Sequence, residues 1–308
     1  MDIKELLPET QENISLAQYS TFKIGGNARF FFVADNKEDI LKAVKAAKQC
    51  RLPFFILGGG SNILFPDRGF DGIVIKIQSV KAKTQNNIIY VDAGVPLSQL
   101  VAMAERAGLS GLEWAAGIYG TVGGAVRGNA GAFGGQILDA LKSVEYFDTA
   151  KEEIRQCNVQ ECHFDYRSSI FKKNKDLIIL SCEFQLESAS KEDIKKKIKE
   201  YKNYRAKHHP LDYPSAGSVF KNPELTEEIK IGYPEIAKNG FAPAGFLIEK
   251  AGLKGRVIGK AQISAKHCNF IINLGGATAK DVLELIALIK KEIKNKFQID
   301  LKEEIFIV

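Results

Sequence analysis

Eight of the nineteen residues from Gly117 to Gly135 are glycines, and no other feature of the sequence constrains the fold as strongly. A glycine-rich backbone loses much conformational entropy on folding, so a ligand or close main-chain packing must hold such a segment in place. A second run, Gly58-Gly59-Gly60-Ser61-Asn62, directly follows an apolar segment that predicts a buried strand. Main-chain N–H groups can converge on an anion where no Cβ intervenes. The two separated segments therefore predict a cofactor whose extended pyrophosphate is gripped from two lobes.

These glycine runs differ from the common nucleotide-binding motifs. In the first run, Ile63 stands where the third glycine of a G-x-G-x-x-G dinucleotide fingerprint belongs. The sequence contains no phosphate-binding loop of the form G-x-x-x-x-G-K-[ST]. Taken alone, the run from Gly58 to Gly60 is equally compatible with a tight turn at the end of a strand. The prediction of a nucleotide cofactor therefore depends on the pair of segments.

A chain of 308 residues predicts two or three compact lobes. Predicted strands outnumber predicted helices before residue 189. A Lys/Glu-rich helix is predicted to follow, with Ser190 and Asp193 as its capping pair and its end near 208–210. Thr278 and Asp281 form the capping pair of a last amphipathic helix, which we expect to cover a sheet. Further helices are predicted from Asn36 and over 97–107, and strands over 53–57, 72–77, 88–92, 143–147, 178–186 and 305–308.

The composition excludes several classes of protein. There is no secretory leader and no run of about 18 apolar residues, so we expect a cytoplasmic protein with no membrane partner. The five cysteines form no C-x-x-C pair, which indicates reduced, mostly buried thiols. The net charge of +6 owes much to the lysines of 191–202, without the interleaved aromatics typical of nucleic-acid binding. The four histidines show no metal-ligand spacing, so no metal is expected.

Seven blocks of sequence, spread from about residue 20 to the C-terminus, carry a family resemblance. They are Thr21-Phe22-Lys23-Ile24-Gly25-Gly26, 58–62, 117–129, Tyr166-Arg167-Ser168-Ser169, 214–223, Ala244-Gly245-Phe246-Leu247-Ile248-Glu249 and 267–273. In this order they resemble the UDP-N-acetylenolpyruvoylglucosamine reductase family. The first two blocks are shared with many flavoproteins of one fold, whereas the Gly-Ser-Val-Phe-Lys-Asn-Pro stretch of 217–223 is specific.

The resemblance implies an α+β chain that joins a two-subdomain FAD-binding fold of the vanillyl-alcohol-oxidase (PCMH) type to a C-terminal α/β substrate-binding domain. The FAD-binding domain is expected over 20–188, with subdomains of about 20–80 and 81–188, and the substrate domain over 189–308, with the terminal strand returning to the active site. Two features depart from the family pattern. Tyr119 stands where the family usually has proline, and only 50 residues separate Arg167 from Ser218. The second departure indicates the short form of the family, which lacks the inserted tyrosine loop.

The implied reaction is reduction of the enolpyruvyl ether of UDP-N-acetylglucosamine in peptidoglycan precursor synthesis, with NADPH as co-substrate and noncovalent FAD as cofactor. Negative charge builds up beside the substrate carboxylate, so a cation and a proton donor are needed. The family match gives Arg167 the first role, which suits its rigid bidentate fork, and Ser218 the second. It also assigns a glutamate near the C-terminus. The family motif selects Glu304, but the adjacent Glu303 stays open because strand alternation only requires the two to face opposite sides.

The resemblance implies further contacts. His267 is equally compatible with a hydrogen-bonded core histidine, and the protein is expected to be a monomer that binds small molecules. Substrate or NADPH contacts are implied for Tyr166, Lys221, Asn222 and His267, and FAD contacts for Gly58, Gly59, Gly60, Ser61, Asn62, Gly117, Thr121, Gly123, Gly124 and Asn129.

Two rival functions remain to be distinguished. An FAD-linked oxidase of the same fold often tethers its flavin through His or Cys, but the loop 58–62 contains neither. A non-catalytic nucleotide-binding module would have no reason to combine Arg167, Ser218 and a C-terminal glutamate. The reductase is therefore the favoured hypothesis, and the FAD-linked oxidase is the alternative.

Overall fold

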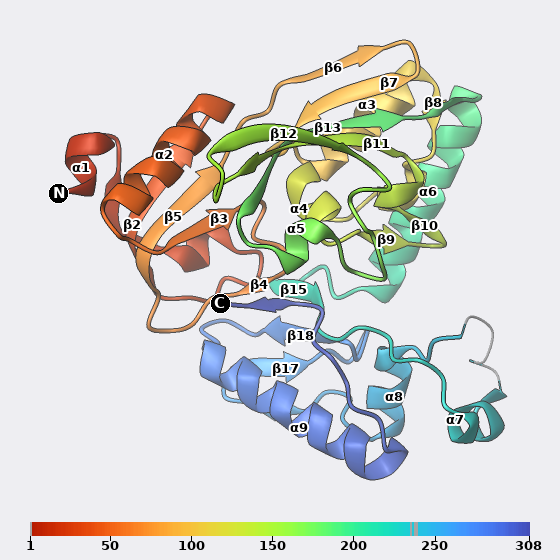
Figure 1. The fold of residues 1–308 in the computed structure, drawn as a ribbon. Helices are drawn as coiled ribbons and strands as arrows, with labels where there is room; N and C mark the ends of the chain where they lie inside the picture. The colour runs from red at the N-terminus through yellow and green to blue at the C-terminus, as the bar shows by residue number, and fades with distance from the viewer. Residues whose placement is uncertain (1, 235, 237–239) are drawn as a thin grey trace. The chain divides into compact units, whose positions relative to one another are not determined.

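The computed structural model describes residues 2–234, 236 and 240–308, which form two compact units (Figure 1). Unit 1 contains residues 2–14 together with Ala28–Gly59 and Asp71–Arg205. Unit 2 contains Ser15–Asn27, Gly60–Phe70 and Ala206–Val308. Both units are therefore assembled from segments that are far apart in the sequence.

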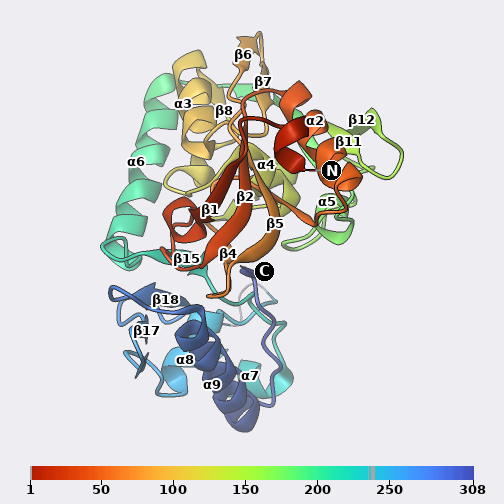
Figure 2. The same ribbon diagram turned by 90° about the vertical axis from the view of Figure 1, so that its left-hand side faces the viewer.

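The first sheet of unit 1 has the order β1 (Gln11–Ser15), β2 (Asn27–Ala34), β5 (Phe70–Ile77), β3 (Phe54–Leu57), and three of its strands fan out side by side in Figure 2. Strands β3 and β5 are parallel, with Leu57 opposite Lys76. Between β2 and β3 the chain forms α2 (Lys37–Gln49), whose N-terminus is capped by the Asn36 side chain. This geometry brings the glycine run after β3 to the end of a buried parallel strand.

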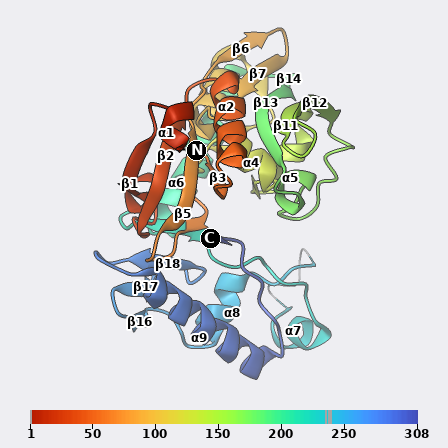
Figure 3. The same cartoon turned by 60° about the vertical axis from the view of Figure 1, so that its left-hand side comes forward.

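The second sheet of unit 1 is antiparallel, with the order β12 (Glu153–Asn158), β11 (Leu141–Asp148), β13 (Leu177–Gln185), β7 (Ile88–Asp92), β6 (Ala82–Gln85). Helix α2 lies between the two sheets (Figure 3), and its Lys37 forms an ion pair with Glu145 of β11. Buried apolar side chains from both sheets and from α2 pack into one hydrophobic core.

Two longer helices complete unit 1. Helix α3 (Leu97–Ala107) follows Pro96 and ends at Gly108, which has a φ of 69°. Helix α6 (Lys191–His208) buries Ile194, Ile198 and Arg205. The short elements are α1 (Ile3–Leu6), β8 (Leu109–Ser110), η2 (Glu113–Ala115), α4 (Val122–Arg127), β9 (Gly131–Ala132), β10 (Gly135–Gln136), η3 (Ile137–Asp139), α5 (Ile170–Lys173) and β14 (Glu187–Ser188).

Unit 2 is a four-stranded sheet, β15 (Ser215–Ser218), β18 (Phe270–Asn273), β17 (Ala261–Ile263), β16 (Val257–Ile258), with the long helix α9 (Ala279–Phe297) beside it (Figure 1). The buried stripe of α9 joins the unit's hydrophobic core, which also includes Phe22, Ile24 and Leu64 from the two early segments. Its other elements are η1 (Leu16–Tyr19), β4 (Ile63–Leu64), α7 (Glu227–Gly232), α8 (Ala244–Lys250) and β19 (Phe306–Ile307).

Most local predictions are confirmed. Thr278 and Asp281 make the expected reciprocal capping bonds, and the Ser190 hydroxyl accepts the Asp193 N–H at 3.4 Å. The terminal strand is shorter than predicted and covers only Phe306–Ile307. The five cysteines are free thiols, and all but Cys50 are buried. Among the described residues, no helix is long and apolar enough to cross a membrane.

The division between the units lies after Arg205, because α6 packs on unit 1, where the Arg205 guanidinium donates to Trp114 O and Ala116 O. The limit predicted from the sequence falls instead at residue 188. The predicted limit separates an FAD-binding domain from a substrate domain, and this functional division stays a prediction.

Candidate active site

The two glycine-rich segments of the sequence lie directly against each other in unit 1. A Cβ on Gly58 would come within 2.6 Å of the Thr121 Oγ1, and a Cβ on Gly59 within 2.6 Å of the Gly120 Cα. Real Cβ contacts are not this short, so neither position can carry a side chain unless its neighbours move. The predicted pairing of these segments is thus a property of the fold.

The start of α4 shows a different use of glycine. Thr121 caps this helix, while the N–H groups of Val122 and Gly123 donate to Val95 O and Ala93 O. A Cβ on Gly123 would lie 2.8 Å from the Ala93 Cβ, but a Cβ on Gly124 would meet only the Thr121 Oγ1, at 3.6 Å. The space that a Cβ on Gly124 would occupy is therefore open, unlike that at Gly123, which fits the approach of a cofactor's pyrophosphate to bare backbone.

Lys76 is a candidate residue that sequence reasoning missed. Its ammonium donates to Gly58 O at 2.9 Å and to Ile77 O, and burial lowers its pKa below the usual value for lysine. The sequence signal that could have indicated Lys76 is a lysine within the apolar strand 73–77. In the structure it lies opposite Leu57, the residue before the glycine run. The residue places a partly buried cation beside the first glycine loop.

The loop that carries Tyr166 and Arg167 is held by Asn129. The Asn129 side chain is fully buried, donates to Gln136 Oε1 and Asp165 O, and accepts the Leu138 N–H. These contacts give Asn129 a structural role, and its predicted contact with FAD stays a prediction.

Gly117, with a φ of 81°, lies against the Arg205 side chain, where a Cβ would come within 3.0 Å of its Cδ.

Arg167 adopts a left-handed backbone conformation, with a φ of 55°. Its Nη1 donates to Asn129 O at 3.4 Å and its Nη2 to Gly131 O at 2.5 Å. The guanidinium carbon lies 5.1 Å from the ring centroid of Tyr166. The structure thus brings together Asn129, Tyr166 and Arg167 of the predicted site.

In unit 2, the end of the first glycine loop meets the C-terminal strand. A Cβ on Gly60 would come within 2.0 Å of Tyr19 O, so this position also excludes a side chain. After Ser61, the Asn62 amide donates to Glu304 O, and Asn62 O accepts the Phe306 N–H. The strand pair β4–β19 is parallel, which brings the C-terminal segment beside the end of the glycine loop, and its predicted return to the active site stays a prediction.

Ser218 ends β15 and pairs with Phe270 of β18. The residues after it are fixed by Asn269, a buried side chain that accepts the Phe220 N–H at 3.0 Å and donates to Phe220 O at 2.8 Å. Sequence reasoning gave Asn269 no role, although it lies within a family block. His267 accepts the Asn269 N–H on its Nδ1, and burial lowers the His267 pKa, so the imidazole is kept neutral. His267 is partly buried, and its predicted substrate contact stays a prediction.

Lys221 and Asn222 follow in an irregular stretch. The Lys221 N–H donates to Lys302 O, and the Asn222 Oδ1 accepts the Ala244 N–H at the start of α8 at 2.9 Å. The Asn222 Oδ1 thus caps the N-terminus of α8. The predicted contact of Asn222 with the substrate stays a prediction.

The two adjacent glutamates differ in their surroundings. The Glu303 carboxylate forms an ion pair with Lys290 of α9 at 2.9 Å. The Glu304 N–H instead donates to Val219 O at 2.7 Å, directly beside Ser218. This arrangement favours Glu304 as the candidate carboxylate. Arg167 belongs to unit 1, and Ser218 and Glu304 belong to unit 2.

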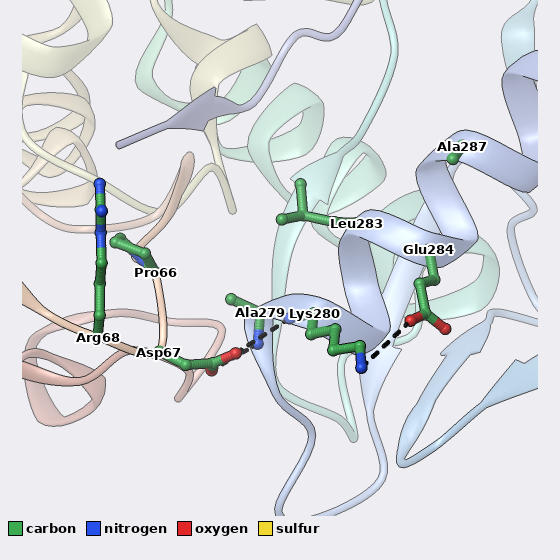
Figure 4. A pocket seen from close by; sticks show the side chains of 8 residues that line it. All are labelled: Pro66, Asp67, Arg68, Ala279, Lys280, Leu283, Glu284 and Ala287. Carbon is green, nitrogen blue, oxygen red and sulfur yellow. Dashed lines mark hydrogen bonds and ion pairs between the residues drawn. The ribbon is translucent and has the colours of Figure 1, made fainter.

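One open cavity of about 490 Å³ lies in unit 2 between the segment 66–68 and α9 (Figure 4). There Asp67 accepts the N–H groups of Ala279 and Lys280, so its carboxylate stabilises the start of α9. None of the predicted site residues, all of which the structure describes, lines this cavity. Over the described part of the chain there is no group of three or more His, Cys, Asp or Glu side chains arranged to hold a metal ion.

Comparisons with known proteins agree with this architecture. A family model described as the C-terminal domain of UDP-N-acetylenolpyruvoylglucosamine reductase matches residues 209–308, and one described as an FAD binding domain matches residues 28–158. A UDP-N-acetylenolpyruvoylglucosamine reductase of Carboxydothermus hydrogenoformans is 40% identical over 307 residues, covering 99% of this chain and 96% of the relative. One of Lactobacillus acidophilus is 40% identical over 309 residues, covering 100% and 98%.

The crystal structure of UDP-N-acetylenolpyruvylglucosamine reductase from Thermus caldophilus superimposes with a TM-score of 0.77 at 34% identity, covering 96% of this chain and 98% of that one. The predicted fold class, an FAD-binding α+β fold with a distinct C-terminal domain, is confirmed. The chain belongs to the UDP-N-acetylenolpyruvoylglucosamine reductase family.

Proposed function

We propose that this protein reduces UDP-N-acetyl-3-O-(1-carboxyvinyl)-glucosamine to UDP-N-acetylmuramate with NADPH, in cytoplasmic peptidoglycan precursor synthesis. The observation that carries the proposal is the match of the whole chain to named reductases, together with an FAD binding domain over residues 28–158. We further propose that the protein acts as a monomer on small molecules, without a nucleic-acid or membrane partner.

The residues present fit an FAD. When bound, FAD supplies hydride transfer between the nicotinamide and the substrate. Packing of Gly58 and Gly59 against 120–121 forms a compact backbone surface, and the open face at Gly124 leaves room for a pyrophosphate. The N–H groups of Val122, Gly123 and Gly124 already have acceptors within the protein. We therefore assign the segment 122–124 to close main-chain packing against the FAD pyrophosphate. Ser61 and Asn62 of the first run are assigned to the FAD contact as well.

Arg167 is assigned to the substrate carboxylate. Its bonds to the main-chain carbonyls of Asn129 and Gly131 orient the guanidinium, which carries five N–H donors in a fixed fork. A guanidinium stays charged at any working pH and matches the planar fork of a carboxylate. Its task is to stabilise the negative charge that builds up on the substrate beside the carboxylate.

Ser218 is assigned to proton donation from its Oγ to the substrate carbon that bears the carboxylate. It is a hydroxyl at the end of a strand, fixed by the neighbouring Asn269 bonds, and so can hold a proton at a defined place. Glu304, whose main chain bonds to Val219, is assigned as the second acid or hydrogen-bond partner. Tyr166, Lys221, Asn222 and His267 are assigned to substrate or NADPH binding.

The proposal is tested by NADPH oxidation with the purified, FAD-loaded protein, in the presence and absence of the enolpyruvyl nucleotide. We expect oxidation to depend on the nucleotide and NADPH to compete with it for one site, which gives parallel double-reciprocal lines with substrate inhibition. Intersecting lines would indicate a ternary complex and exclude a shared site. Oxygen-dependent turnover without the nucleotide would instead favour an FAD-linked oxidase.

A further inference from the structure

The guanidinium of Arg167 depends on one hairpin of unit 1. The hairpin is the β9–β10 pair, in which Ala132 lies opposite Gly135 and Gly131 opposite Gln136. Gly131 O receives the Nη2 bond of Arg167, and Asn129 O, just before the hairpin, receives the Nη1 bond. Whatever fixes this hairpin therefore fixes the orientation of the arginine.

The turn of the hairpin is strained. Its two residues, Phe133 and Gly134, have φ values of 54° and 85°, the pattern of a two-residue turn that favours Asn-Gly. A phenylalanine in the left-handed region is strained, because its Cβ comes too close to the following carbonyl oxygen. Strained residues persist where the surrounding structure holds them and often do so at functional sites. Phe133 thus requires a compensating contact.

An aromatic cluster on α6 supplies that contact. The Phe133 ring stacks on Tyr201 with centroids 4.5 Å apart and an interplanar angle of 16°, and meets Tyr204 edge-on at 5.2 Å. The Arg205 guanidinium carbon lies 5.0 Å from the Phe133 centroid. Arg205 is itself anchored to Trp114 O and Ala116 O. On the other strand, a Cβ on Gly135 would come within 2.4 Å of the Trp114 Cδ1, so the hairpin lies flat on that ring.

We propose that Phe133 is a positioning residue for Arg167: stacked on α6, it holds the hairpin whose carbonyls aim the guanidinium at the substrate carboxylate. The second support is Asn129, which ties the same hairpin to the Arg167 loop through Gln136 and Asp165. This inference rests on the proposed function, because it assumes that Arg167 binds the carboxylate. Tyr201, Tyr204 and Arg205 act through their contacts with Phe133.

The decisive variant is Phe133→Asn, which gives the turn a residue that suits its backbone but removes the ring. If the turn itself were what mattered, this substitution would be harmless or stabilising. We expect FAD content and flavin bleaching by NADPH to stay within twofold of the wild type. Reoxidation by the enolpyruvyl nucleotide should fall at least tenfold. Phe133→Tyr, which keeps the ring, should stay within twofold, and the matched control is Ile154→Asn, an equally simple change at an exposed apolar residue on β12.

A double-mutant cycle then tests the route of the effect. In an Arg167→Ala background, Phe133→Asn should cause no more than a twofold further loss, because the residue has nothing left to position. Equal losses in both backgrounds would overturn the proposal. So would a Phe133→Asn variant that reoxidises at the wild-type rate.

A third measurement does not depend on the reaction. Hydrogen exchange of the segment 129–138 should be faster in Phe133→Asn than in the wild type and Phe133→Tyr, and unchanged exchange would contradict the proposal. If wild-type protein fails to be reoxidised by the nucleotide, the proposed function is wrong. The exchange data still decide whether Phe133 holds the hairpin.

Discussion

The candidate residues of the two units differ in kind. In unit 1 the glycine loops are closely packed backbone, because Gly58, Gly59 and Gly123 each leave no room for a Cβ. In unit 2 the candidates are the side chains of Ser218 and Glu304, on a main chain fixed by Asn269 and Val219. Gly217, next to Ser218, has nothing within 4 Å of an added Cβ. We infer that unit 1 mainly binds the cofactor and unit 2 mainly acts on the substrate, so variants in the two should fail differently.

The largest effect is expected for Ser218→Ala in unit 2. FAD content and bleaching of the flavin by NADPH should be close to wild type, because neither needs a proton donor for the substrate. Reoxidation by the enolpyruvyl nucleotide should fall by about 10²- to 10⁴-fold, the usual cost of losing a general acid. Stopped-flow absorbance of the flavin follows both half-reactions. Ser218→Cys should recover part of the rate, and equal slowing of both half-reactions would assign Ser218 to shaping the site.

Gly124→Leu in unit 1 should act on the cofactor instead. A bulky side chain on the open face of Gly124 should block close approach of the pyrophosphate. At about 1 to 3 kcal/mol for overpacking, FAD affinity should weaken roughly 5- to 150-fold. Gly124→Ala is the control, because its Cβ would meet only the Thr121 Oγ1 at an ordinary 3.6 Å. Full FAD content in the leucine variant, measured by flavin release, would remove this loop from the FAD site.

A pair of glycine-to-alanine variants separates packing from backbone strain. Gly123→Ala brings a Cβ to 2.8 Å from the Ala93 Cβ and should destabilise unit 1 by about 1 to 3 kcal/mol. Gly217→Ala meets no neighbour but adopts a φ of 77°, so only strain of about 1 to 2 kcal/mol is expected. Urea unfolding gives the two free energies. FAD loss should accompany the first variant and not the second.

The smallest effect concerns the pH dependence of stability. Burial lowers the His267 pKa from its ordinary 6.5, with smaller influences from His208 and Glu249. In the unfolded chain the His267 imidazole therefore takes up a proton more readily than in the folded protein. The stability that the neutral imidazole provides is complete above pH 6.5 and is lost as the pH falls through the lowered pKa of the folded state. His267→Asn should flatten the acid side of the unfolding free-energy profile. The matched control is His163→Asn, at an exposed histidine of unit 1, and an unchanged profile in His267→Asn would contradict this account.

Local chemistry explains what could be predicted from the sequence. The Thr278 and Asp281 capping pair and the start of α2 at Asn36 involve neighbours in the chain, so their sequence signals suffice. The glycine segments were singled out because only close packing or a ligand could order them; the structure packs them on each other, and the cofactor that they are expected to grip stays a prediction. Strand alternation could not separate Glu304 from Glu303; the family motif selected Glu304, which stays a prediction, and the ion pair of Glu303 with Lys290 on another element has no signal in the local sequence.

Long-range contacts account for what sequence reasoning missed. Lys76 becomes noteworthy only when the parallel pair β3–β5 places it beside the glycine loop. Asn129 lies in a glycine-rich family block, and its predicted contact with FAD stays a prediction, but no local pattern indicated that its side chain also ties a hairpin to the loop of Arg167. Both cases depend on tertiary packing that no local pattern encodes.

The composite make-up of unit 2 has a consequence for how the protein is made. The chain passes between the units after residues 14, 27, 59, 70 and 205, and β4 finds its parallel partner only in Phe306–Ile307. A ribosome that adds roughly 5 to 20 residues per second needs about 10 to 50 s to travel from one strand to the other. Throughout that interval the nascent chain carries β4 and the apolar side chains of Phe22, Ile24 and Leu64 without the rest of their core. Unit 1 can begin to fold on the ribosome, but unit 2 has to wait until Phe306–Ile307 has been synthesised.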